Sequence, residues 1–181
     1  MGHRSKALVA AVPGALLLIM LTGCSAAAAS VKAELPRPTA TASVTTLTSA
    51  KFGAFVPGAV ATTYNESAVP VGASVSISLT STAEGTFATV RGAGLPPSRE
   101  ITVSLHTKAC GPRGSAAGPR YLAVPDNSDM RGGSLELVMT PNPDGSVEGR
   151  TAVGWNLRSG EAASLVLSEE KLGAVGCVTL A

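Results

Sequence analysis

Apolar and polar residues alternate along several short stretches of the chain. In the stretches 75–79, 101–105, 135–139 and 165–167, every second residue is a large apolar one. Side chains of a β-strand point alternately to its two faces, so this period of two predicts strands with one buried face. The pattern predicts about eight strands, near residues 59–64, 73–81, 86–92, 100–107, 134–140, 146–156, 163–168 and 174–180.

Turn-forming residues separate these stretches. Asn142-Pro143-Asp144-Gly145 predicts a hairpin turn, because proline presets φ and glycine accepts a positive φ. Many short strands with such spacing predict an all-β sandwich or a flattened barrel. The segment from Lys108 to Gly133 is rich in Gly and Pro and is not strand-like, which predicts a long loop of the kind that often carries function.

The first 23 residues have the pattern of an export signal. Arg4 and Lys6 precede an apolar run from Ala7 to Leu21, and the sequence Leu21-Thr22-Gly23-Cys24 follows. This ending resembles the lipobox of bacterial lipoproteins, in which the cysteine is acylated. A membrane-spanning helix is the alternative, but it needs about 20 apolar residues. We therefore expect residues 1–23 to be a signal peptide and Cys24 to be the lipid attachment site on the outer face of the cell membrane.

The remainder of the chain divides by composition. Residues 24–58 are rich in Ala, Ser, Thr and Pro and show no sustained period, so we expect them to form a flexible tether. Residues 59–181 contain all the predicted strands and are expected to form the folded domain. The sequence thus predicts a globular domain that is attached to the cell envelope through its lipid.

Charge argues against nucleic acid as a partner. The sequence has 14 basic and 12 acidic residues, and Arg4 and Lys6 lie in the predicted signal, which leaves 12 of each. Only 3% of the residues are aromatic. The chain has no basic stretch and no aromatic platform of the kind that nucleic-acid-binding proteins use.

Two cysteines remain after Cys24. In an exported chain, Cys110 and Cys177 are most simply paired in a disulfide. Closing a loop of this length would stabilise the fold by about 4 kcal/mol in the chain-entropy description.

Several motifs together resemble one family. The chain is similar to the exported copper-zinc superoxide dismutases of actinobacterial type over about residues 59–181. The motifs that carry the resemblance are Gly94-Leu95-Pro96-Pro97, His106 to Gly111, Ala117 to Tyr121, Trp155 to Arg158 and Gly173 to Val178. The resemblance implies an eight-stranded Greek-key β-barrel whose disulfide corresponds to Cys110 and Cys177. The order of the motifs disfavours an unrelated immunoglobulin-like sandwich.

The resemblance also implies where metal ligands would lie. The family places two histidines at i and i+2 on one strand, and here these positions are Ser104 and His106. The bridging histidine of the family corresponds to Arg120, and a further copper ligand corresponds to Ser168. The arginine that guides superoxide in the family corresponds to Ala174.

The count of histidines decides the functional expectation. The sequence has two, and His3 lies in the predicted signal, so the mature chain keeps only His106. One imidazole does not make a redox copper site of the family's type. We therefore expect a non-catalytic lipoprotein with no metal cofactor, which uses the domain as a binding or structural module of the envelope. The alternative is a family enzyme or copper-handling protein that retains copper and zinc in an altered site.

Two residues leave local alternatives open. His106 is either a hydrogen-bonded residue of a former site or a weak copper ligand assisted by Met130, Met139 or Asp126. Arg120 either points into solvent or replaces the metals by pairing with a carboxylate. The candidate partners of Arg120 are Glu169, Asp126 and Asp129.

The lipoprotein prediction is testable by metabolic labelling with a fatty acid. We expect label on the wild-type chain and none on Cys24→Ala, because the cysteine thiol is the acceptor of the lipid. Absence of label on the wild type, or equal label on both chains, would contradict it.

Overall fold

The computed structural model describes residues 44–123 and 133–181. These residues belong to one compact unit, Thr39–Ala181. The predicted signal, Cys24 and most of the predicted tether lie outside the described residues. The described part contains nine strands and one short 3₁₀ helix: β1 (Val44–Lys51), β2 (Ala61–Thr63), β3 (Ser74–Thr82), β4 (Gly85–Ala93), β5 (Ile101–His106), η1 (Gly114–Ala117), β6 (Glu136–Met139), β7 (Val147–Val153), β8 (Ser164–Glu169) and β9 (Gly173–Thr179).

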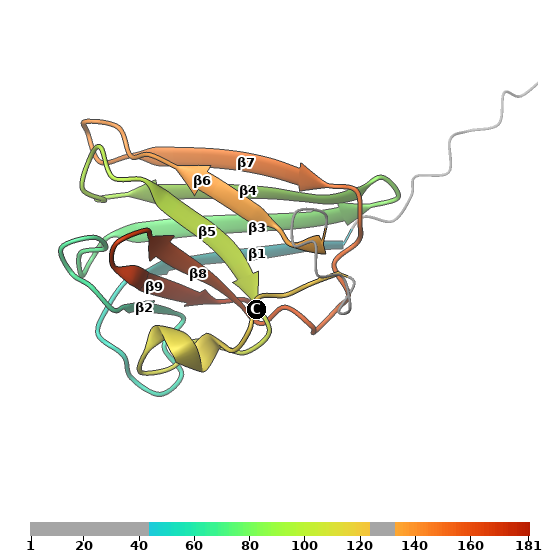
Figure 1. The fold of residues 1–181 in the computed structure, drawn as a ribbon, viewed down its shortest axis with the longest axis horizontal. Helices are drawn as coiled ribbons and strands as arrows, with labels where there is room; N and C mark the ends of the chain where they lie inside the picture. The colour runs from blue at the N-terminus through green and yellow to red at the C-terminus, as the bar shows by residue number, and fades with distance from the viewer. Residues whose placement is uncertain (1–43, 124–132) are drawn as a thin grey trace, which may run out of the picture. The chain divides into compact units, whose positions relative to one another are not determined.

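The strands form two antiparallel sheets that face each other (Figure 1). The first sheet has the order β1-β3-β4-β7, and the second has the order β2-β9-β8-β5-β6. The prediction of an all-β protein is therefore confirmed. Hydrogen bonding does not close the described strands into a barrel, so the architecture is a two-sheet sandwich.

The core lies between the sheets and follows from the alternation seen in the sequence. Ile77 and Leu79 of β3 are almost fully buried, and so are Val103 and Leu105 of β5. Along β3, the Ser and Thr residues that alternate with these apolar ones lie on the outer face of the sheet and are partly exposed. Burying one face of each sheet against the other supplies most of the hydrophobic stabilisation of such a sandwich.

All eight predicted strands are present, with boundaries that shift by a few residues. A ninth strand, β1, was not predicted. It lies within the segment predicted to be a flexible tether, so that prediction is wrong for Val44–Lys51. Thr48 and Ala50 of β1 pair with Ile77 and Val75 and share the core-facing side of the sheet. The folded part of the chain thus begins before residue 59.

The turn between β6 and β7 has the predicted tight geometry. Asn142 N donates to Ser146 O at 2.8 Å, and Gly145 has a positive φ of 78°. The prediction of a hairpin is nevertheless wrong, because β6 and β7 belong to different sheets. The turn carries the chain from one sheet edge to the other. Gly149 of β7 permits this close crossing, since a Cβ there would lie 2.6 Å from Met139 Cγ.

The predicted disulfide is present and attaches a loop to the second sheet. Cys110 and Cys177 are bonded, with their Cα atoms 5.7 Å apart. Their side chains belong to a small cluster on the outer side of the sheet that also includes Val166 of β8 and Ala117 of η1. β8 is therefore buried on both faces. In the described part of the chain, no helix is long and apolar enough to cross a membrane.

Removing the disulfide should destabilise the fold. The double substitution Cys110→Ala and Cys177→Ala is expected to lower the free energy of unfolding by about 4 kcal/mol, because the 67-residue separation gives the unfolded chain more conformational freedom. Urea denaturation measures this change. Cys24→Ala is the matched control and should leave the free energy of unfolding unchanged. A loss below about 1 kcal/mol for the double variant would contradict a stabilising role.

Candidate functional site

The residues at the expected ligand positions lie on the outer face of the second sheet. Ser104 and His106 project from β5 on the face opposite to Val103 and Leu105, which are in the core. Arg120 joins them because a backbone bridge pairs it with His106. The loop after β5 folds back so that Tyr121 N donates to Leu105 O at 2.8 Å. Three of the predicted positions therefore meet at the end of β5.

Both ring nitrogens of His106 have hydrogen-bond partners. Nδ1 lies 2.9 Å from the carbonyl oxygen of Gly118, and Nε2 lies 3.2 Å from Oγ of Ser104. A carbonyl oxygen can only accept, so Nδ1 carries the proton and Nε2 of the neutral ring accepts from the Ser104 hydroxyl. This arrangement agrees with the interpretation of His106 as a hydrogen-bonded residue.

The surroundings of His106 favour the neutral imidazole. Partial burial of the ring lowers its pKa below the ordinary value, because burial penalises the charged form. The hydrogen bond to Gly118 opposes this effect, and the positive charge of Arg120 adds to it. His106 is therefore uncharged at neutral pH, with a lone pair on Nε2.

Arg120 forms an ion pair, but not with the residue proposed from the sequence. Its Nη1 lies 3.2 Å from Oε1 of Glu136 on β6. Glu169, the partner considered, instead binds Arg99 at 2.8 Å. The other two candidate partners, Asp126 and Asp129, lie outside the described residues. Both members of the pair Arg120–Glu136 are more than a third exposed, so the pair contributes at most about 1 kcal/mol to stability.

The other two substituted positions lie further along the sheet. Ser168 of β8 pairs with Thr102 and with Ala174. Thr102 is four residues before His106 on β5, a distance of roughly 13 Å along the strand. Ala174 lies beneath η1, since a Cβ on Gly114 would be 2.3 Å from the Cβ of Ala174. Ser168 and Ala174 are thus on the same sheet but not beside His106.

This set of residues does not fit a copper or zinc ion of the family's type. Around His106 the chain supplies a hydroxyl, one imidazole nitrogen, the Glu136 carboxylate that pairs with Arg120, and the guanidinium itself, which is always charged and does not ligate. Met139 cannot act as a second copper ligand beside His106, because it is buried in the core opposite Ile101. Met130 and Asp126 lie outside the described residues. Within residues 44–123 and 133–181, no three His, Cys, Asp or Glu side chains form a metal-binding group.

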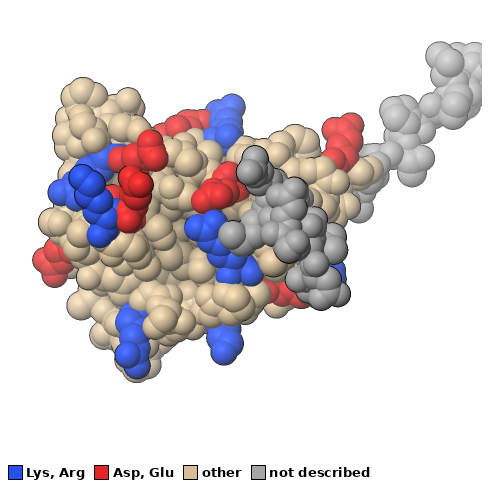
Figure 2. Space-filling view, viewed as in Figure 1, with Lys and Arg blue, Asp and Glu red and all other residues tan. Residues whose placement is uncertain are grey.

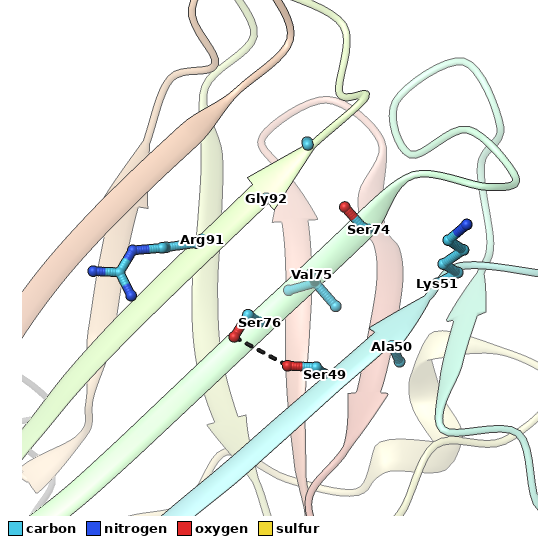
Figure 3. Close-up of a pocket in the computed structure, with 9 residues that line it drawn as sticks. Ser49, Ala50, Lys51, Ser74, Val75, Ser76, Arg91 and Gly92 are labelled. Atoms are coloured by element: carbon cyan, nitrogen blue, oxygen red, sulfur yellow. Dashed lines mark hydrogen bonds between the residues drawn. The ribbon is translucent and has the colours of Figure 1, made fainter.

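A shallow hollow of about 490 Å³ lies on the outer face of the first sheet, across β1, β3 and β4 (Figure 3). Its floor is made of small side chains, and Ser49 Oγ donates to Ser76 Oγ at 3.1 Å. Lys51 and Arg91 point away from each other on its two sides. Arg91 is held by Glu148 at 3.0 Å, so its charge is already partnered. No group in this hollow is set up for acid–base chemistry.

Comparison with known proteins does not identify a family. No protein-family model and no curated protein matches the chain. On the face shown in Figure 2, most Lys and Arg side chains lie next to Asp or Glu in small groups. The function is therefore inferred from the residues around His106 and their geometry.

The pKa of His106 should depend on Arg120. We expect Arg120→Gln to raise this pKa, because the substitution removes a neighbouring positive charge. Arg150→Gln, which removes an exposed arginine from the first sheet, is the matched control and should not change it. NMR titration of the imidazole measures the pKa, and His3→Gln in every chain removes the second histidine signal.

The lowered pKa of His106 makes the stability of the fold depend on pH. The folded-state pKa lies below the unfolded value near 6.5, so the unfolded chain binds the proton more tightly. The contribution of His106 to the free energy of unfolding is complete above the unfolded-state pKa and is lost as the pH falls through the folded-state pKa. An unchanged pKa in Arg120→Gln, or a pKa above 6.5 in the wild type, would contradict the proposed electrostatics.

Proposed function

We propose that this protein is an exported, lipid-anchored member of the copper-zinc superoxide dismutase family that has lost the family's chemistry. It acts as a binding or structural module on the outer face of the cell membrane. The observation that carries the proposal is the ion pair of Arg120 with Glu136 beside His106, at the position where the resemblance places the bridging histidine. A guanidinium in this position repels a metal cation.

The topology supports the assignment to this family. Superoxide dismutases of this family share the β-sandwich architecture. From β4 the chain crosses to β5 and β6 in the second sheet and returns as β7 beside β4. A Greek key also returns its fourth strand beside its first, although its first three strands are joined by hairpins, whereas here β4 and β5 lie in different sheets. The pairing of Cys110 with Cys177 is a second feature in agreement with the family.

A copper-handling protein is the second candidate, and one observation favours it. The bond from His106 Nδ1 to the Gly118 carbonyl fixes the ring and leaves Nε2 with a lone pair. Histidines that bind metals usually have their other nitrogen held in this way. The ring would then be one ligand, and the remaining ligands would have to come from outside the set described above.

Metal analysis and superoxide consumption distinguish the two candidates. After the purified chain is loaded with copper and dialysed against a mild chelator, we expect less than stoichiometric copper, because His106 is the one nitrogen ligand at the site. Superoxide consumption should not exceed that of the same amount of free copper. His106→Gln is the control and should behave as the wild type does.

Two results would overturn the proposal. Stoichiometric copper that is lost in His106→Gln would favour a copper-handling protein. Superoxide consumption above that of free copper would favour a residual enzyme. Either result would also make Arg120→His an informative variant, since it restores the imidazole that the resemblance places there.

A further inference from the structure

A cavity of about 520 Å³ lies beside the candidate site, and Arg120 lines it. It lies between the chain segment that follows η1 and the loop between β7 and β8. We propose that it binds a small organic anion, namely a single carboxylate attached to an apolar body. The cavity is lined by Thr107, Pro119, Arg120, Tyr121, Leu122, Arg158, Gly160 and Glu161.

Two arginines line this cavity, and each is only partly engaged. Arg120 donates from Nη1 to Glu136, and Arg158 donates from Nε to Glu161 at 2.7 Å. A guanidinium has five N–H donors. In the described part of the chain, the other donors of Arg120 have no partner, and Arg158 has one further acceptor in the Tyr121 hydroxyl. Among the described residues, both cations therefore keep donors whose hydrogen bonds a carboxylate can accept.

The two arginines are held in place before a ligand arrives. Tyr121 is 2% exposed, and its hydroxyl accepts from both N and Nε of Arg158 at 3.4 Å. Its ring packs against Trp155 with the centroids 5.6 Å apart. Glu136 restrains Arg120 from the opposite side. Such restraint reduces the conformational entropy lost when a ligand binds.

The charge and polarity of the lining select the class of ligand. Arg120 and Arg158 each pair with one carboxylate, Glu136 outside the lining and Glu161 within it, and each guanidinium has more donors than its partner uses. A carboxylate can bind a guanidinium with both oxygens through such donors. Pro119 and Leu122 supply apolar surface for the rest of the ligand. A cation would meet two arginines, and a short anion would leave the apolar surface uncovered.

This inference rests on the proposed function in one respect, which is that the module binds a ligand instead of turning over superoxide. It gives a role to Arg158, which belongs to the motif Trp155 to Arg158, where the resemblance places no metal ligand. The sheet face around Ser168 and Ala174 has no part in it. A ligand in this cavity would contact the arginine that occupies the former ligand position.

Fluorescence of Trp155 provides a direct test, because it is the single tryptophan of the chain and contacts Tyr121. Hexanoate is the probe, and the metal-free chain is titrated at constant ionic strength. We expect a saturable change with hexanoate, a weaker one with acetate, which lacks the apolar body, and none with hexylamine. Arg120→Gln and Arg158→Gln should each weaken hexanoate binding about tenfold, since each removes a charged hydrogen bond.

Control variants make the result specific. Arg150→Gln removes an arginine that is also paired with one glutamate, Glu148, but lies on the first sheet, and it should leave binding unchanged. Arg158→Lys keeps the charge but loses the fork geometry, so it should bind with intermediate affinity. Melting curves confirm that each variant is folded, and a variant that is not folded is replaced by its lysine counterpart.

Three outcomes would overturn the inference: no saturable change with hexanoate, equal binding of hexylamine, or equal weakening by Arg150→Gln. The last would indicate general electrostatic attraction instead of a site. None of these outcomes bears on copper or superoxide, so a failure here is distinguishable from a failure of the proposed function. Copper-dependent superoxide consumption would contradict the proposed function and leave the hexanoate titration unaffected.

Discussion

The disulfide between Cys110 and Cys177 is the constraint on which the arrangement around His106 depends. It attaches the loop after β5 to β9, and the loop then returns along β5 through backbone hydrogen bonds, such as Lys108 N to Ala117 O at 2.9 Å. This return brings the Gly118 carbonyl to His106 and places Arg120 beside it. It also directs Tyr121 into the core. One covalent bond and a few backbone bonds therefore position the residues of both the candidate site and the adjacent cavity.

The same arrangement connects strand and loop through groups of the chain itself. A metal ion at such a site would hold strand and loop together through shared ligands. Here the disulfide, the His106–Gly118 bond and the exposed pair of Arg120 and Glu136 connect the same segments. The ion pair is the weakest of these connections, because both its side chains are solvated. The guanidinium thus matters less for stability than for the charge that it places beside the imidazole and in the cavity.

Most of the fold could be predicted because eight strands bury alternate large apolar residues. β1 was missed for a physical reason. Its core-facing positions include Thr48 and Ala50, while Leu47 is 65% exposed. The strand therefore lacks the alternation of large apolar residues that marks the others. Its threonines favour extended structure, but threonines also occur in the Ser- and Thr-rich sequence before it, so composition alone does not separate the two.

The candidate site could be predicted only where local sequence determines it. Two residues at i and i+2 on a strand share a face, which places Ser104 beside His106. The partner of Arg120 depends instead on the register between β5 and β6, which sets Glu136 opposite Ser104. No local pattern fixes that register. The cavity with Arg120 and Arg158 likewise joins segments almost forty residues apart. Its two arginines carry the same charge, and each is paired with a carboxylate from a different part of the chain, Arg120 with Glu136 and Arg158 with Glu161.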